Sequence, residues 1–572
     1  MPIARAVRIV TEVAAVDRTF DYSITDATSQ VGIGDRVRVN FHGRSVRGWV
    51  TAFVEEEREL KPLVKWGGFG PPATMLELLE WCARRWVAPV ARFYLAASPR
   101  RNIIQLPVAP GKVAVAENVL ATAVSVEPGV TRLGPCVDPL GIILSAYQAT
   151  REKEGSLLIL VPNVGWAQRL AGRLSQRGLA VALGEREWDK MRATWPVIVG
   201  TRGEAFAPTS KLAGAVVIDA DDESYRSEAS PTYHAVDVVR QRALLDGAPL
   251  WLLSSLPSPT LLAGRSDCAV AEGEAASWPE VVVVDRRQSD PRDGVLSAET
   301  LEVARRAVEG PEPVAVVVIL QRLGTGRILA CRKCGELARC ATCGAPEEDS
   351  DSGTLRCSQG CGERETFCTS CGSTNLRRVR SGVTTLARDV GNLLHQEVTE
   401  VTATFVEGTP THRVVVGTEA VFARLRRAGV VIFVDVDQYL LAPRERARRD
   451  AVYAVAKAGR LVGSRSEARG VVVLQTRRAG DAVISTVVAG NLEEIQVADV
   501  ADAQLLESPP FGARAVISGD AAPAFVAALD RQKVRVSDTH DSFVVTATDV
   551  DALTLALGEV ARPAGRLRLA VE

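Results

Sequence analysis

Apolar runs alternate with helical segments through the middle of the chain. From Gly141 onward, helical patterns such as GWAQRLAGRLSQRG separate the strand-like runs SLLILVP, PVIVGT, AVVIDA and PLWLLSSL. A second series follows, with the runs PVAVVVIL, HRVVVGT, GVVIFVDVD and GVVVLQT. Parallel strands require a crossover between them, and a helix usually supplies it. The pattern therefore predicts two α/β lobes in tandem.

The two ends of the chain have different patterns. Near the start, DRVRVNF and SVRGWVTAFV alternate with a period of two around the turn HGR, and the helical pattern MLELLEWCARRW follows. This predicts a small β-rich module with a helical tail. After about residue 480, strand and helix patterns follow one another in the order β-α-β-β-α-β, which predicts a small α+β module.

These patterns divide the chain into five predicted parts. Residues 107–135 carry four prolines and no sustained period, so we interpret them as a linker. The predicted parts are an N-terminal module (1–106), the linker (107–135), a first lobe (136–310), a second lobe (311–480) that contains a cysteine-rich insertion (331–371), and a C-terminal module (481–572).

Composition limits the classes of protein that remain. Hydrophobic residues make up 47% of the 572 positions, enough to bury a core in each part. Lys and Arg number 68 against 69 Asp and Glu, so the overall charge does not point to nucleic acid. The longest apolar run, Val314 to Leu320, is far shorter than the roughly 18 residues of a membrane span. We expect a cytoplasmic protein with no membrane partner.

Eight of the eleven cysteines form three CxxC pairs and one CxxxC pair. Each short pair can direct two thiolates to one ion at about 2.3 Å, and two pairs complete a tetrahedron. The spacing predicts two structural zinc ions, and it favours them over disulfides or an iron–sulfur cluster. It leaves open whether neighbouring or nested pairs combine. The predicted ligands are Cys331, Cys334, Cys340, Cys343, Cys357, Cys361, Cys368 and Cys371.

Three motifs carry a resemblance to a known family. VGTRGEAFAP (Val199 to Pro208) is similar to IGTRSALFAP, YHAVD (Tyr233 to Asp237) is similar to YHARD, and ILACRKCGELARCATCG is similar to the start of that family's zinc region. With TFDYSI and GDRVRVNF near the start, the chain resembles the PriA family of bacterial replication-restart proteins. The resemblance implies two RecA-like lobes with a zinc-ribbon insertion and an N-terminal 3′-end-binding domain. Residues 107–135 are too few for the winged helix that family members carry there.

The resemblance also implies a function and a DNA-binding site. Family members bind stalled forks, D-loops and the 3′ end of the nascent strand, and they reload the replicative helicase with other primosome proteins and single-strand-binding protein. The matching residues of the 3′-end pocket are Phe20, Asp21, Tyr22, Gly43 and Lys61, and Arg202 is a further candidate for a phosphate contact. The residues alone also allow another interpretation, in which Phe20 and Tyr22 pack in a strand and Asp21 caps a turn.

The groups that hydrolyse nucleotide are missing from the sequence. No GxxxxGK[ST] string exists in the chain. Where the family has DEEH, this chain has Ala220 in place of the glutamate that positions water, and Gly463 stands where the second of two arginines belongs. We therefore expect no catalytic residues, only the remnants Asp219 and Arg460, and no helicase activity. The expected role is binding DNA and recruiting partners.

Two other functions remain open at this point. One is an ATP-dependent 3′→5′ helicase with an unconventional nucleotide pocket. The other is a zinc-ribbon protein that binds RNA or transcription complexes. The sequence also leaves open whether ATP binds without being hydrolysed.

Overall fold

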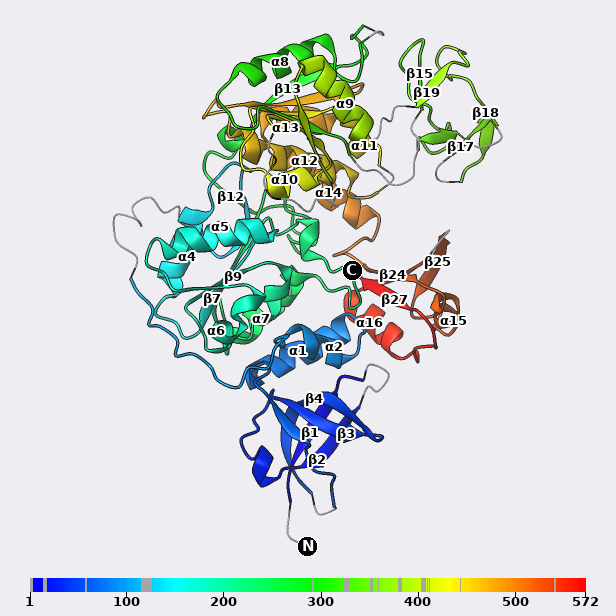
Figure 1. The fold of residues 1–572 in the computed structure, drawn as a ribbon. Helices are drawn as coiled ribbons and strands as arrows, with labels where there is room; N and C mark the ends of the chain where they lie inside the picture. Colours follow the sequence, from blue (N-terminus) through cyan, green and yellow to red (C-terminus); the bar gives the residue numbers. More distant parts are fainter. Residues whose placement is uncertain are drawn as a thin grey trace. The chain divides into compact units, whose positions relative to one another are not determined.

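Figure 1 shows the fold in a computed structural model. The described residues are 4–13, 18–56, 59–114, 126–290, 293–321, 329–349, 353–357, 360–378, 383–402, 408, 410, 412–442, 444–539 and 542–572. Residues 115–125 of the predicted linker lie outside this set. The chain forms two compact units: the first comprises 1–131, 138–269 and 496–572, and the second comprises 132–137 and 270–495.

The first unit begins with a five-stranded sheet of order β2-β1-β4-β3-β5. Its strands alternate as the sequence predicts: in β3, Val37 and Val39 are buried whereas Arg38 and Asn40 are exposed. Two helices, α1 (Leu76–Arg85) and α2 (Val90–Ala96), follow the sheet. This confirms the β-rich module with a helical tail. The strands are β1 (Ala4–Thr11), β2 (Thr19–Ser23), β3 (Arg36–Phe41), β4 (Arg44–Glu56) and β5 (Lys65–Gly68).

The second sheet has the order β12-β6-β11-β10-β7-β9-β8. Strands β11, β10, β7, β9 and β8 pair in parallel, and every residue of β7 is buried, which explains its unbroken apolar run. Strand β6 lies in the segment predicted as linker. The strands are β6 (Gly129–Arg132), β7 (Ser156–Leu160), β8 (Val181–Leu183), β9 (Val197–Gly200), β10 (Leu212–Ile218), β11 (Leu250–Ser254) and β12 (Ala269–Val270), and the helices are α4 (Leu140–Thr150), α5 (Val164–Ser175), α6 (Trp188–Arg192) and α7 (Ala235–Asp246).

The second unit contains a six-stranded parallel sheet of order β13-β23-β22-β14-β21-β20. Together with the previous sheet it confirms the two predicted α/β lobes. Its strands are β13 (Glu280–Asp285), β14 (Val316–Ile319), β20 (Val398–Val401), β21 (Val414–Gly417), β22 (Val430–Phe433) and β23 (Val471–Thr476), and its helices are α8 (Ala298–Glu309), α9 (Val383–Leu394), α10 (Ala420–Arg424), α11 (Asp437–Leu440), α12 (Ala447–Val462) and α13 (Ala482–Ala489).

The cysteine-rich insertion between β14 and α9 forms two small antiparallel sheets. One pairs β15 (Leu329–Cys331) with β19 (Leu376–Arg378), so the two ends of the insertion lie side by side. The other has the order β16-β17-β18 and joins β16 (Glu347–Asp349), β17 (Thr354–Cys357) and β18 (Glu363–Glu365). The insertion therefore folds back on itself, because the strands of the second sheet lie between the two strands of the first sheet in sequence.

The C-terminal module follows helix α14 (Glu493–Leu505) and has the predicted β-α-β-β-α-β order. Its antiparallel sheet has the order β25-β26-β24-β27. The elements are β24 (Ala513–Ser518), α15 (Ala522–Ala527), β25 (Arg535–Thr539), β26 (Ser542–Ala547), α16 (Val550–Gly558) and β27 (Arg568–Val571).

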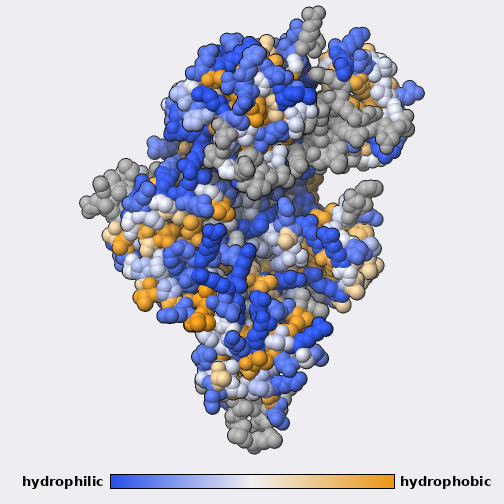
Figure 2. Space-filling view, in the orientation of Figure 1, coloured by the Kyte–Doolittle hydropathy of each residue, from blue (hydrophilic) through white to orange (hydrophobic). Residues whose placement is uncertain are grey.

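Figure 2 shows hydrophilic residues over much of the visible face, with hydrophobic residues gathered in patches among them. Among the described helices, none combines the length and the apolar character that crossing a bilayer requires.

Candidate metal centres, DNA-end site and nucleotide-site remnants

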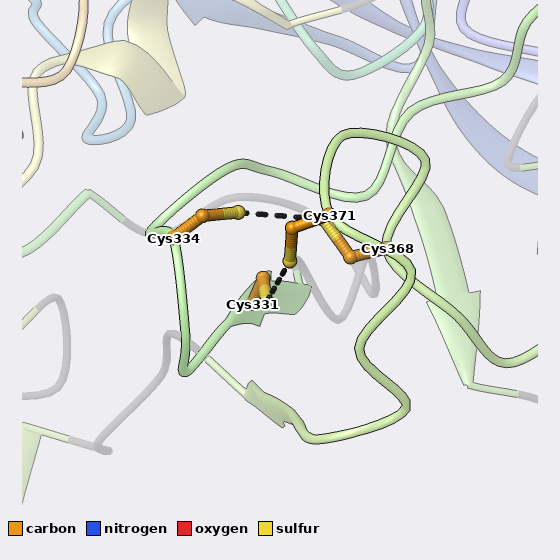
Figure 3. Close-up of side chains that lie close together, drawn as sticks. All are labelled: Cys331, Cys334, Cys368 and Cys371. Carbon is orange, nitrogen blue, oxygen red and sulfur yellow. Dashed lines mark hydrogen bonds between the residues drawn. The ribbon is translucent and has the colours of Figure 1, made fainter.

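The eight cysteines of the insertion gather into two groups of four. In each group the sulfur atoms all lie within 4.8 Å of one another. The first group, drawn in Figure 3, contains Cys331, Cys334, Cys368 and Cys371. The second contains Cys340, Cys343, Cys357 and Cys361. The arrangement is nested, because the second group lies between the two halves of the first in sequence.

The geometry of each group fits a tetrahedral ion. The Sγ atoms of Cys331 and Cys371 lie 3.5 Å apart, as do those of Cys334 and Cys368. Four thiolates at about 2.3 Å from one ion would lie roughly 3.8 Å apart. Burial raises the pKa of the Cys331 thiol, but the backbone N–H groups of Cys334 and Lys333 outweigh it and bring the pKa to about 6. Each group could therefore hold one metal ion with no open coordination position.

Three of the predicted DNA-end residues, Phe20, Asp21 and Tyr22, lie on β2, and their side chains point to both of its faces. Tyr22 is buried in the core of the sheet, and Phe20 packs against the same core. Asp21 lies between them in the strand, so its side chain faces the opposite side. There it pairs with Arg8 of β1, whose Nε donates to Oδ1 of Asp21 at 3.0 Å. The Asp21 side chain is only 9% exposed, and Arg8 was not among the residues predicted from the sequence.

Gly43 and Lys61, the other two predicted residues, make hydrogen bonds through their backbone atoms near β2. The hydroxyl of Tyr22 donates to the carbonyl of Asn40 at 3.2 Å, and the Asn40 side chain accepts from the N–H of Gly43 at 3.1 Å. Lys61 is exposed, and its carbonyl accepts from the N–H of Ser23 at 3.0 Å. Tyr22 and Gly43 therefore both contact Asn40 before the β3–β4 turn, Lys61 lies beside Ser23 at the end of β2, and Asp21 faces the other side.

The side chain of Arg202 makes hydrogen bonds within the first unit. Its Nη1 donates to the carbonyls of Ser224 and Arg226, at 3.1 and 2.6 Å. The neighbouring motif residues Phe206 and Tyr233 pack against each other with ring centroids 5.0 Å apart, and Tyr233 also contacts Trp86 of the segment after α1. The two motifs that carry the resemblance in this lobe therefore join it to the N-terminal helices.

The connection between β6 and α4 leads into residues 139–155, ahead of β7, where the resemblance implies a phosphate-binding loop. Two of its residues, Pro135 and Pro139, lack the N–H that such a loop uses to bind phosphate. At the start of α4, Asp138 accepts from the N–H of Leu140 at 3.1 Å and pairs with Arg173. Burial raises the pKa of Asp138, but the hydrogen bond from Arg173 outweighs it and the pKa is lowered. The Asp138 carboxylate thus takes up the helix-terminal N–H of Leu140, which is then not free for a phosphate.

The acidic stretch after β10 is also engaged internally. Ala220 is 1% exposed, and its N–H donates to the carbonyl of Leu253 at 2.9 Å. The next residue, Asp221, accepts at Oδ2 from the hydroxyl of Ser254 at 2.9 Å and from the N–H of Ser258 at 3.1 Å. Asp219 is 5% exposed and has a positive φ of 53°. The carboxylate of Asp221 therefore accepts hydrogen bonds from residues at and just after the end of β11.

The two arginine positions of the second unit are likewise altered. Arg460 of α12 donates from Nε to the carbonyl of Pro135 at 3.0 Å. Gly463, in the place of the second arginine, ends α12 with φ 90° and ψ 174°. An L side chain adopts this conformation only with strain. The backbone conformation at position 463 therefore favours glycine.

Comparison with known proteins agrees with the sequence motifs. Residues 8–99 match the family model of the PriA 3′DNA-binding domain (3′BD). The probable replication restart protein PriA of Mycobacterium leprae is 28% identical over 443 residues, 66% of each chain. Replication restart protein PriA of Bacillus subtilis is 28% identical over 279 residues, 44% of this chain and 34% of that protein. The chain is similar to PriA proteins over about two thirds of its length.

The similarity to PriA proteins is partial in length. The chain spans slightly less than two thirds of the Mycobacterium leprae protein, and it matches 54% of replication restart protein PriA of Haemophilus influenzae at 26% identity. Among solved structures, RecG bound to a three-way DNA junction aligns with 70% of this chain and 50% of that chain, at 10% identity and a TM-score of 0.34. The matched 3′DNA-binding domain contains Arg8 and all five residues predicted for the PriA pocket.

Proposed function

We propose that this chain is a replication-restart protein that binds forked DNA at a free 3′ end and acts without hydrolysing ATP. The observation that carries the proposal is the match of residues 8–99 to the PriA 3′DNA-binding domain. By family resemblance, its substrates are stalled forks and D-loops. Its partners would be other primosome proteins and single-strand-binding protein, which reload the replicative helicase.

The chemistry around Asp21 suits the end of a DNA strand. An ionised carboxylate only accepts hydrogen bonds, so it distinguishes a terminal 3′-hydroxyl, which donates, from an end that lacks one. Arg8 holds this carboxylate in place, and its own side chain is 44% exposed. A guanidinium beside the carboxylate supplies a phosphate contact next to the hydroxyl. Arg8 and Asp21 therefore offer a donor and an acceptor to the same terminal nucleotide.

The absence of hydrolysis rests on three replacements. Asp138 puts a carboxylate at the start of α4, Ala220 replaces the water-positioning glutamate, and Gly463 replaces one arginine. An arginine of this kind is worth about 10³–10⁵ in rate. The three losses together should remove measurable turnover. The two lobes then act as a folded support for the DNA-binding and metal-binding parts.

Zinc is the metal that best fits the two Cys₄ groups. Closed sets of four thiolates at tetrahedral spacing are typical of structural zinc. One ion would join the two ends of the insertion and the other would hold its middle, since small metal modules of this kind depend on the ion for stability.

A binding assay with end-modified DNA tests the proposal. We expect the protein to bind a fork with a 3′-hydroxyl about 10-fold or more tightly than the same fork with a 3′-deoxy end, because a hydrogen bond to a charged group contributes about 1.5–3 kcal/mol. Asp21→Asn should remove this preference. Asp26→Asn, at an exposed acidic residue of the same module, is the matched control and should keep it. Equal affinity of the parent protein for both ends would contradict the proposal.

Two further measurements identify the alternative functions. Phosphate release from ATP that rises with forked DNA would favour the helicase. Equal affinity for single-stranded RNA and for the 3′-ended fork, unchanged by Asp21→Asn, would favour the RNA-binding protein.

A further inference from the structure

The connection that follows β6 is bound inside the second unit. Residues 132–137 belong to that unit, whereas the residues before 132 and those that follow 137 up to 269 belong to the first. We call residues 132–137 the strap. Its contacts come from the start of the second unit, around residues 271–277, and from helix α12.

The start of the strap is fixed by a buried ion pair. The Nε of Arg132 donates to Oε1 of Glu274 at 2.7 Å, and the two side chains are 5% and 9% exposed. The carbonyl of Arg132 also accepts from the N–H of Ala271 at 2.9 Å. Separating a buried pair of this kind leaves a charge without its partner, which is costly. Arg132 therefore anchors the strap to the second unit.

The middle of the strap lies against the turn that ends at Ser277. Gly134 is buried there, and an added Cβ would lie 1.7 Å from Oγ of Ser277 and 2.8 Å from the carbonyl oxygen of Glu274. The N–H of Cys136 donates to the carbonyl of Ser277 at 3.2 Å. Only glycine allows so close an approach, so the backbone of the strap itself makes this contact.

The far side of the strap meets helix α12. The Nε of Arg460 donates to the carbonyl of Pro135 at 3.0 Å. The thiol of Cys136 lies nearby: burial raises its pKa to about 12, and the charge of Arg460 acts in the opposite direction. An arginine that assists hydrolysis places its guanidinium on phosphate oxygen. Here a carbonyl oxygen of the chain itself accepts from that guanidinium.

We propose that the strap is a nucleotide-independent lock: it stays bound to the second unit, keeps Arg460 on the carbonyl of Pro135, and is not displaced by ATP. Every contact described for it is made by groups of the chain, so no ligand is required to hold it. Arg460 is then a positioning residue for the strap. This goes beyond the proposed function, because it concerns the state of Arg460 and not the binding of DNA.

The native thiol of Cys136 reports whether the strap is open, because it is shielded while the strap is bound. The full chain is treated with iodoacetamide at one fixed pH, with and without ATP and Mg²⁺. Mass spectrometry of the peptide that contains Cys136 then gives its rate of alkylation. Cys82, which is 0% exposed, is the internal reference for a general loss of the fold.

Two variants open the strap by different means, and each has a matched control. Arg460→Ala removes the hydrogen bond to the strap, and Gly134→Ala forces the strap away from Ser277. Arg413→Ala is the control for the first, because Arg413 donates to the carbonyl of Gly310 elsewhere in the same unit. Gly480→Ala is the control for the second, because an added Cβ there meets no atom within 4 Å.

We expect both strap variants to raise the alkylation rate of Cys136 by about 10-fold or more, since a lost hydrogen bond to a charged group favours local opening by such a factor. Loss of the Arg460 charge alone would slow the reaction, because that charge lowers the pKa of the thiol. A faster reaction in Arg460→Ala therefore measures opening. The two controls, and the parent with ATP, should react at the parent rate.

Three results would overturn the inference. One is a parent protein whose Cys136 reacts faster when ATP is added. The second is a pair of strap variants that react as slowly as the parent. The third is an equal rise at Cys82, which would show that the strap opens only when the whole fold does. Phosphate release from ATP with Cys136 still shielded would refute the proposed function alone, so the two failures are distinguishable.

Discussion

The nested grouping of the cysteines predicts which zinc ion is lost when particular pairs are removed. One variant replaces the first group by serine: Cys331, Cys334, Cys368 and Cys371. A second variant also carries four serines, at Cys331, Cys334, Cys340 and Cys343. The first variant leaves four sulfur atoms within 4.8 Å of one another. The second leaves only isolated pairs, because it removes half of each group.

The expected zinc content follows from these groupings. The parent should hold two zinc ions, the first variant one and the second none. A complete Cys₄ set binds zinc with about 10–16 kcal/mol at pH 7, so at micromolar zinc each intact set is filled. The sulfur atoms of Cys343 and Cys357, 3.5 Å apart, belong to the set that survives in the first variant.

Native mass spectrometry of the purified chains measures this content directly. Both variants carry the same number of substitutions, so a general loss of folding would affect them alike. The reverse result, with no zinc in the first variant and one in the second, would show that neighbouring pairs combine and that the nested geometry is wrong. Iron with inorganic sulfide in the parent protein would refute zinc itself.

Three further predictions concern single residues of the two lobes. Asp138→Ala should lower the free energy of unfolding by about 1–2 kcal/mol through loss of a helix-terminal hydrogen bond and an exposed ion pair. The pKa of Asp138 is lowered in the fold, so its contribution is present above its ordinary pKa near 4 and is lost as the pH falls through the folded value. In urea unfolding, the difference in stability between variant and parent should therefore be larger at pH 7 than at pH 3. Arg242→Leu should cost at least about 3 kcal/mol in thermal unfolding, because the buried guanidinium donates to the carbonyls of Ala207 and Thr209 at 2.7 and 2.8 Å; a loss below about 1 kcal/mol would contradict this. Gly463→Arg should lower stability by about 1–3 kcal/mol and yield no phosphate release, since φ there is 90°; a stable variant that hydrolyses ATP would show that this glycine is not the obstacle.

Local patterns in the sequence predict the elements of this fold well. The run SLLILVP predicts β7 because a strand covered on both faces has no polar position to break it. The C-terminal order of strands and helices likewise follows from its changes of period. The two α/β lobes are predictable for the same reason, since each strand and helix is specified by residues close together in the chain.

The contacts that define the candidate sites are not local, and this is why the sequence leaves them open. Arg8 and Asp21 are 13 positions apart and meet only because β1 and β2 pair in that register. Arg460 meets the carbonyl of Pro135, 325 positions earlier. Likewise, spacing alone allows two ways of combining the cysteine pairs, and the pairing of β15 with β19 favours the nested one. Each case depends on the sheet topology, which a local pattern does not contain.

The same distinction explains how the proposed loss of nucleotide chemistry is compatible with a fold that is kept. Phe206 and Tyr233 lie in two of the motifs that resemble PriA, and the ring of Tyr233 packs against those of Phe206 and Trp86. Replacing such residues would open cavities that cost several kcal/mol each. The groups that act on nucleotide lie instead in loops and at helix ends, where Asp138 can be satisfied by Arg173 and Asp221 by Ser254. Loss of those groups costs little stability when the polar atoms that remain form hydrogen bonds or ion pairs within the protein. On the proposed function, packing therefore keeps the lobes folded, and binding of DNA by the N-terminal module would need none of the nucleotide groups.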